Sequence, residues 1–156
     1  TGSYRNAIGD AFSRETINLC RAVFSSEDMM SSLNREKIMV ASYLGGCSIA
    51  TSYVGVVHPF SAGLSVVLGV HHCVANCIVM RAMEEFYPDA FNEFWSFVDK
   101  QKIDIPKGIC RNLTDEQYSS LYNSTVVHEK PLTNALGENF KDILTKDKVI
   151  QLFKSM

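Results

Sequence analysis

The chain has 156 residues, of which 46% are hydrophobic and 21% are charged, and its formal net charge is −2. A chain of this length can bury a sizeable core as one domain, and its proportions are those of an ordinary globular protein. Because DNA and RNA are bound mainly through clustered positive charge, we expect no nucleic-acid partner.

Apolar residues recur at helical spacing along the chain, without a clear period-2 strand, a glycine-rich phosphate loop or an internal repeat. These patterns predict an all-α fold in a single domain that covers residues 1–156. We expect helices over residues 4–24, 29–33, 35–55, 59–67, 72–86, 89–100, 114–127, 132–136 and 146–154, and a loop over 103–112.

Residues with strong preferences for helix ends support several of these boundaries. The segment Thr114-Asp115-Glu116-Gln117 is a capping box, Asn34 can cap the helix that follows it, and Thr145 can cap the final helix. Gly69 and Gly137 are expected to end helices, and Pro88 is expected to end the helix before it.

One face of the helix expected after Asn34 consists of small residues at spacings of three and four. They are Ala41, Gly45, Ser48, Ser52 and Gly55. Such a stripe either lets a neighbouring helix approach closely or leaves room for a substrate or a nicotinamide.

A long stretch without charge carries three of the four histidines. No Asp, Glu, Lys or Arg occurs between Lys37 and Arg81, and His58, His71 and His72 all lie in that interval. Histidines in such a setting are either core residues with one satisfied hydrogen bond or neutral metal ligands. His58 precedes a proline and the other two follow a glycine, so we expect all three at breaks between helices.

A shared metal ion would impose a geometric condition on His58 and His72. In an unbroken helix, residues 14 positions apart (72 − 58) would be separated by about 21 Å. Two ligand atoms on one ion lie about 3–4 Å apart, so the chain must turn back between the two histidines. Gly63 and Gly69 are the residues that could allow this turn.

The remaining candidates for chemistry are weaker. Trp95 is expected in the core, and His128 lies in a polar segment and is expected at the surface. The five cysteines are an odd number without the spacing of a small disulfide scaffold, so we expect reduced thiols. Cys73 and Cys77 could share a helix face with His72, but their spacing is not that of a structural zinc site.

Several motifs together resemble one known enzyme family. His58, the 14-residue gap and the segment His72-Cys73-Val74-Ala75-Asn76 resemble the iron-dependent (group III) alcohol dehydrogenases. Four further segments look like one branch of that family, the 3-deoxy-D-manno-octulosonate (Kdo) 8-oxidases. They are Gly45-Gly46-Cys47-Ser48-Ile49-Ala50, Glu84-Glu85-Phe86-Tyr87-Pro88, Ile103-Asp104-Ile105-Pro106 and Asn134-Ala135-Leu136-Gly137.

The resemblance covers essentially the whole chain and implies a fold and an activity. The fold would be the helical C-terminal domain of the iron-containing alcohol dehydrogenase and dehydroquinate synthase-like proteins. The activity would be oxidation of a primary alcohol, such as that of the lipopolysaccharide sugar acid Kdo, by metal-assisted hydride transfer. The ion would be iron or zinc, with His58 and His72 as two of its ligands and His71 as the fallback if the register is off by one.

The same resemblance implies what lies outside these residues. We expect the chain to be a fragment of a larger cytoplasmic enzyme whose N-terminal domain binds most of the NAD(P) and which forms a homodimer. The family's first two ligands, an Asp and a His four residues apart, should lie just before Thr1. Without them, the isolated chain is expected neither to bind metal tightly nor to turn over.

The chain departs from the family pattern at two positions. Ala62 stands where the family usually has a histidine near the nicotinamide, and Cys73 replaces the usual glycine after the last ligand. No catalytic or cofactor-binding residue is therefore assigned beyond the two metal ligands.

Two alternatives remain open at this point. The chain could be a non-catalytic helical interaction or regulatory module whose histidines are structural. The apolar residues 53–70 are also long enough to cross a bilayer. However, a proline, two glycines and the lack of flanking positive charge favour a buried core segment, so we expect no membrane partner.

Overall fold

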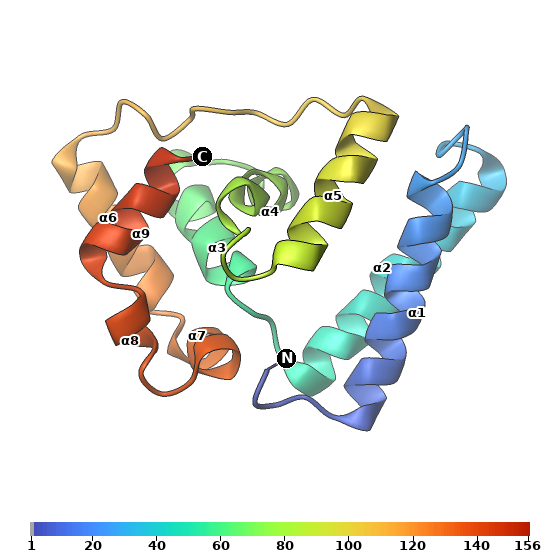
Figure 1. Ribbon diagram of the computed structural model, residues 1–156, viewed down its shortest axis with the longest axis horizontal. Helices are drawn as coiled ribbons and strands as arrows, with labels where there is room; N and C mark the ends of the chain where they lie inside the picture. Colours follow the sequence, from blue (N-terminus) through green and yellow to red (C-terminus); the bar gives the residue numbers. More distant parts are fainter. Residues whose placement is uncertain (1) are drawn as a thin grey trace.

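The computed structural model describes residues 2–156, and all the regular structure in that range is helical (Figure 1). The all-α prediction is confirmed. In chain order the helices are α1 (Ala7–Phe24), α2 (Ser32–Ser52), α3 (Val57–Leu68), α4 (His72–Val79), the 3₁₀ turn η1 (Met80–Ala82), α5 (Pro88–Gln101), α6 (Asp115–Val126), α7 (Glu129–Leu136), α8 (Phe140–Ile143) and α9 (Lys146–Lys154).

The first two helices form a hairpin that lies at one end of the molecule (Figure 1). The small-residue stripe of α2 faces α1, where Ser48 Oγ lies 2.6 Å from Ser13 Oγ and 3.2 Å from the Gly9 carbonyl oxygen. A Cβ atom added to Gly9 would lie 2.9 Å from Ser52 Oγ. The small residues therefore allow α1 and α2 to pack closely. This is the first of the two roles that the sequence suggested for the stripe.

The core is built around α3, which lies between α4 and α6. Phe60 and Leu64 on α3 are fully buried and pack with apolar residues from α4, α6 and the C-terminal helices. A Cβ atom added to Gly63 would lie 3.0 Å from Thr125 Oγ1 and 3.4 Å from the Leu121 carbonyl oxygen of α6. Gly63 thus allows α3 and α6 to pack at close range, which orients both helix ends.

Several helix boundaries follow the sequence signals. The capping box at Thr114 is present, with hydrogen bonds in both directions between Thr114 and Gln117. Gly69 ends α3 in the left-handed conformation, with φ of 67°, and Thr145 caps α9. Gly137 follows α7, as predicted.

Several boundaries differ from the prediction. Helix α1 begins at Ala7 instead of residue 4, α2 ends at Ser52 instead of residue 55, and α7 begins at Glu129 instead of residue 132. Residues 29–33 do not form a helix of their own, because α2 begins at Ser32 with Ser31 as its cap. The side chain of Asn34, the expected cap, instead donates to Ser26 Oγ and to the Asp28 carbonyl. The helix after His71 ends at Val79 instead of Phe86, and Pro88 begins α5 at its first turn, where a proline costs no hydrogen bond. The short helix α8 was not foreseen.

One buried amide joins three distant parts of the chain. Asn134 on α7 donates through Nδ2 to the carbonyls of Ser52 and Val54 at 3.1 Å, and its Oδ1 accepts from the Tyr4 backbone N–H at 2.9 Å. The N-terminal end of the described chain therefore lies beside α7 and the end of α2 (Figure 1).

Within residues 2–156, no single helix has both the length and the hydropathy of a membrane span. The helices α2 and α3 satisfy these criteria only when taken together, and they are bent by 107° at their junction.

Replacing Asn134 with Ala should lower the free energy of unfolding by about 2–3 kcal/mol, because buried backbone groups lose their partners. Urea unfolding followed by circular dichroism measures this change. Asn123→Ala on the exposed face of α6 is the matched control and should change stability by less than about 0.5 kcal/mol. Equal effects of the two substitutions would contradict the assigned role of Asn134.

Candidate metal centre

His58 lies in the first turn of α3, directly before Pro59. The side chain is half-buried, while Pro59 and Phe60 after it are buried. Ser61 Oγ donates to the His58 carbonyl at 2.9 Å, which satisfies a backbone group in this turn. The imidazole therefore extends from a well-fixed helix end at the edge of the core.

His72 is the first residue of α4 and is also half-buried. The chain reverses at Gly69, and His71 is outside the helix with φ of −56° and ψ of 132°. After the extended His71, α4 packs against α3. The centroids of the His58 and His72 rings lie 5.0 Å apart, with an interplanar angle of 77°.

The separation between the rings of His58 and His72 is close to the value that a shared metal ion requires. Two imidazoles with metal–nitrogen distances of about 2.1 Å and a tetrahedral angle between them have ring centres about 5 Å apart. The separation between His58 and His72 has this size, whereas an unbroken helix between them would give about 21 Å. The structure thus brings together the two histidines that the sequence pattern selected.

A third histidine, which was expected at the surface, lies beside these two. His128, expected at the surface, is half-buried between α6 and α7, and its ring centroid is 6.0 Å from that of His58. Its local sequence is polar and gives no sign of this position. Only the packing of α6 against α3 brings His128 to His58, so no local signal could have identified it.

The surroundings favour the neutral form of His58. Burial lowers the pKa of His58, and the neighbouring His72 and His128 lower it further, because a second positive charge nearby is unfavourable. A neutral imidazole is the form that binds metal ions. The ring geometry and the lowered pKa therefore point to the same chemistry.

The other predicted candidates are less suited to a metal. His71, the fallback ligand, is exposed and precedes α4. Burial and the neighbouring Cys73 raise the pKa of Cys77, which disfavours the thiolate that a metal needs. In the described range, no three His, Cys, Asp or Glu side chains are arranged as a ready-made metal site.

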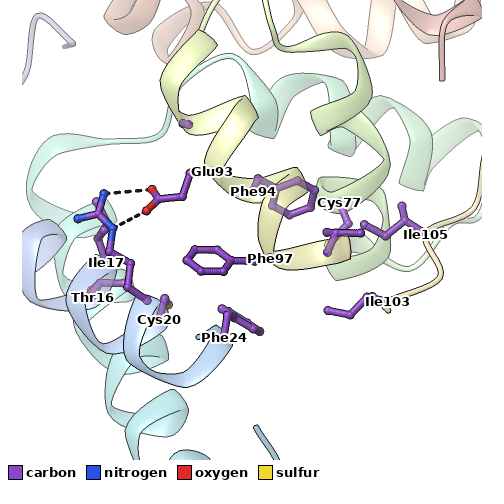
Figure 2. Close-up of a pocket in the computed structure, with 13 residues that line it drawn as sticks. Thr16, Ile17, Cys20, Phe24, Cys77, Glu93, Phe94, Phe97, Ile103 and Ile105 are labelled. Atoms are coloured by element: carbon purple, nitrogen blue, oxygen red, sulfur yellow. Dashed lines mark hydrogen bonds and ion pairs between the residues drawn. The ribbon is translucent and has the colours of Figure 1, made fainter. Parts of the chain in front are cut away.

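A separate apolar pocket of about 290 Å³ lies between α1 and α5. Figure 2 shows Phe24, Phe94 and Phe97 in its walls. Glu93, at the side of the pocket, forms an ion pair with Arg21. Burial raises the pKa values of Cys20 and Cys77, which also line it, so these thiols stay protonated near neutral pH. Hydrophobic side chains dominate this pocket, and the histidines are not among its lining residues.

Trp95 packs against the hydrophobic core, in agreement with its expected structural role, and the Arg81 guanidinium lies 4.7 Å from its ring centroid.

A scan of the chain against protein-family models found no matching family.

The pKa of His58 in the metal-free chain should lie below the ordinary histidine value of about 6.5. Substituting His128 by Gln should raise this pKa, because one of the neighbouring positive charges is removed. Imidazole proton resonances followed by NMR between pH 4 and 9 measure both values. A His58 pKa at or above the ordinary value would contradict the described burial.

The lowered pKa of His58 also determines how stability changes with pH. The folded chain binds a proton at His58 less strongly than the unfolded chain does, so acidification through the ordinary histidine pKa should destabilise the fold. The contribution of His58 should disappear in His58→Gln, which thermal unfolding at pH 5 and pH 7.5 can measure. If the pH dependence of stability were the same in His58→Gln as in the unchanged chain, the assigned contribution of His58 would be contradicted.

Cys73 and Cys110 should differ in their reactivity toward thiol reagents. Burial raises the pKa of Cys110 to about 11, and its side chain is inaccessible, whereas Cys73 is exposed. At pH 8 a disulfide reagent such as DTNB should modify Cys73 quickly and Cys110 only after unfolding. Mass spectrometry of the modified peptides identifies each site, and equal labelling rates would disprove this difference.

Proposed function

We propose that this chain is the metal-binding helical half of an iron-containing-type alcohol dehydrogenase or oxidase. Its fold would be the C-terminal domain shared with dehydroquinate synthase-like proteins. The observation that carries the proposal is the convergence of His58 and His72, whose ring centroids are 5.0 Å apart despite a 14-residue gap in the sequence. The resemblance selects these same two residues as metal ligands.

The residues fit a divalent metal by their chemistry. Two imidazoles from two different helix starts provide neutral nitrogen donors, which suit both iron and zinc. Burial and neighbouring imidazoles keep His58 unprotonated, so its lone pair is available near neutral pH. When bound, the ion would polarise an alcohol oxygen and lower its pKa, so that hydride can leave carbon for a nicotinamide.

The chain's own residues would hold this site. Pro59 and Ser61 fix the first turn of α3 that carries His58, and Gly69 sets the turn that returns His72. The fully buried Phe60 and Leu64 lie on the same helix and anchor it in the core.

The remaining parts of the proposal rest on the resemblance. The substrate would be a primary alcohol of a sugar acid such as Kdo, and NAD(P) would be bound mainly by an N-terminal domain of the whole enzyme. The other two metal ligands would lie in an Asp-x-x-x-His segment before Thr1. The whole enzyme would be a cytoplasmic homodimer.

The alternative, a helical module with structural histidines, receives less support. A structural histidine of the core is expected to be fully buried, with a hydrogen bond to its ring. His58 and His72 are only half-buried, and their rings pack edge to face at a centroid separation of 5.0 Å. This arrangement is better suited to two ligands than to two structural residues.

In the whole enzyme, His72→Ala should abolish alcohol oxidation and bound metal together, because one imidazole ligand is lost. Metal content by mass spectrometry and turnover with an alcohol panel measure the two effects. His71→Ala is the matched comparison and should retain metal, since His71 is exposed and precedes the helix. The opposite outcome would place the ligand one position earlier, and full retention in both variants would disprove the ligand assignment.

A further inference from the structure

We propose that His128 is a third imidazole ligand, which joins His58 and His72 at a single divalent cation. This inference rests on the proposed function for the first two ligands and extends the site to a residue that no sequence pattern assigns.

The three rings form a cluster with His58 in the middle. The ring centroid of His58 lies 5.0 Å from that of His72 and 6.0 Å from that of His128, and both pairs are edge to face. Each ring comes from a different place in the fold, namely the start of α3, the start of α4 and the corner between α6 and α7. Three ligating groups from separate elements thus meet at one edge of the core.

The position of His128 is fixed by the packing of α6 on α3. Thr125 of α6 is fully buried and faces Gly63 of α3 at close range. His58 precedes Gly63 by five residues and His128 follows Thr125 by three, so the two histidines meet where the start of α3 lies beside the end of α6. The His128 backbone N–H donates to the Thr125 carbonyl at 3.3 Å, and its own carbonyl accepts from Leu132.

To share one cation, the His128 ring would have to move toward the other two. Its separation from His58 exceeds that between His58 and His72 by 1.0 Å (6.0 − 5.0). Within residues 2–156, no three such side chains are already arranged in ligand geometry. The His128 side chain is only half-buried, so its ring has room to rotate toward the cation.

The donor set has a clear chemical preference. Three neutral imidazoles are a known set of protein ligands for zinc, and iron also accepts imidazole nitrogen. Three ligands on one chain would let these 156 residues bind Zn²⁺ measurably on their own. The sequence-based expectation of weak binding assumed only two ligands.

The experiment is a titration of this chain with Zn²⁺ alone by isothermal calorimetry, at pH 7.5 in a non-coordinating buffer. His128→Gln should weaken Zn²⁺ binding at least tenfold, whereas Val127→Ala, an exposed neighbour, should bind within twofold of the unchanged chain. His128→Cys, which restores a ligating atom, should recover most of the affinity. Circular dichroism verifies that each variant is folded.

A second readout uses the imidazole ring nitrogens of the three histidines, observed by ¹⁵N NMR during the titration. The ring resonances of His128 should shift with those of His58 and His72 and stop shifting at one equivalent of Zn²⁺. Wild-type affinity in His128→Gln, combined with a large loss in His58→Gln, would overturn the third ligand and leave the proposed function standing. Wild-type affinity for Zn²⁺ in His58→Gln and in His72→Gln would overturn both the third ligand and the proposed function.

Discussion

The close contact between α3 and α6 at Gly63 is the constraint on which the rest of the site depends. Thr125 and the Leu121 carbonyl occupy the space where a larger residue would place its side chain. This contact sets how the two helices lie along each other, and therefore which residues meet at their ends. A displacement of one helical turn would move His58 by about 5.4 Å relative to α6 and separate it from His128.

The turn after α3 adds the second part of the arrangement. Gly69 takes a left-handed conformation, which costs a residue with a side chain about 1 kcal/mol or more. His71 is extended, and α4, which begins at His72, packs against α3. A helical interior with this reversal places two imidazoles side by side in surroundings that contain little charge. Burial lowers the pKa of His58, and the neighbouring His72 and His128 lower it further, which favours the neutral imidazole.

Local signals in the sequence predicted much of the fold. The capping box at Thr114, the cap at Thr145 and the stop at Gly69 depend only on neighbouring residues, and all three are present. The break at Val79 was missed because apolar residues continue at helical spacing through the 3₁₀ turn that follows. The role of Asn34 was missed because its side chain bonds to residues before the helix instead of capping it.

The site was predicted only in part for a similar reason. His58 and His72 stand out because a charge-free stretch and two helix breaks surround them, and both features are visible in the sequence. The place of His128 depends on a contact between residues 62 positions apart in the chain, Gly63 and Thr125. No pattern near His128 records that contact, so its position became apparent only from the packing of the helices.

The most direct measurement of the central claim is the position of the metal in a crystal of the whole protein, located by anomalous scattering at the metal's absorption edge. The account predicts one ion with ring nitrogens of His58 and His72 at about 2.0–2.2 Å. An ion bound elsewhere, with these two imidazoles uncoordinated, would contradict it.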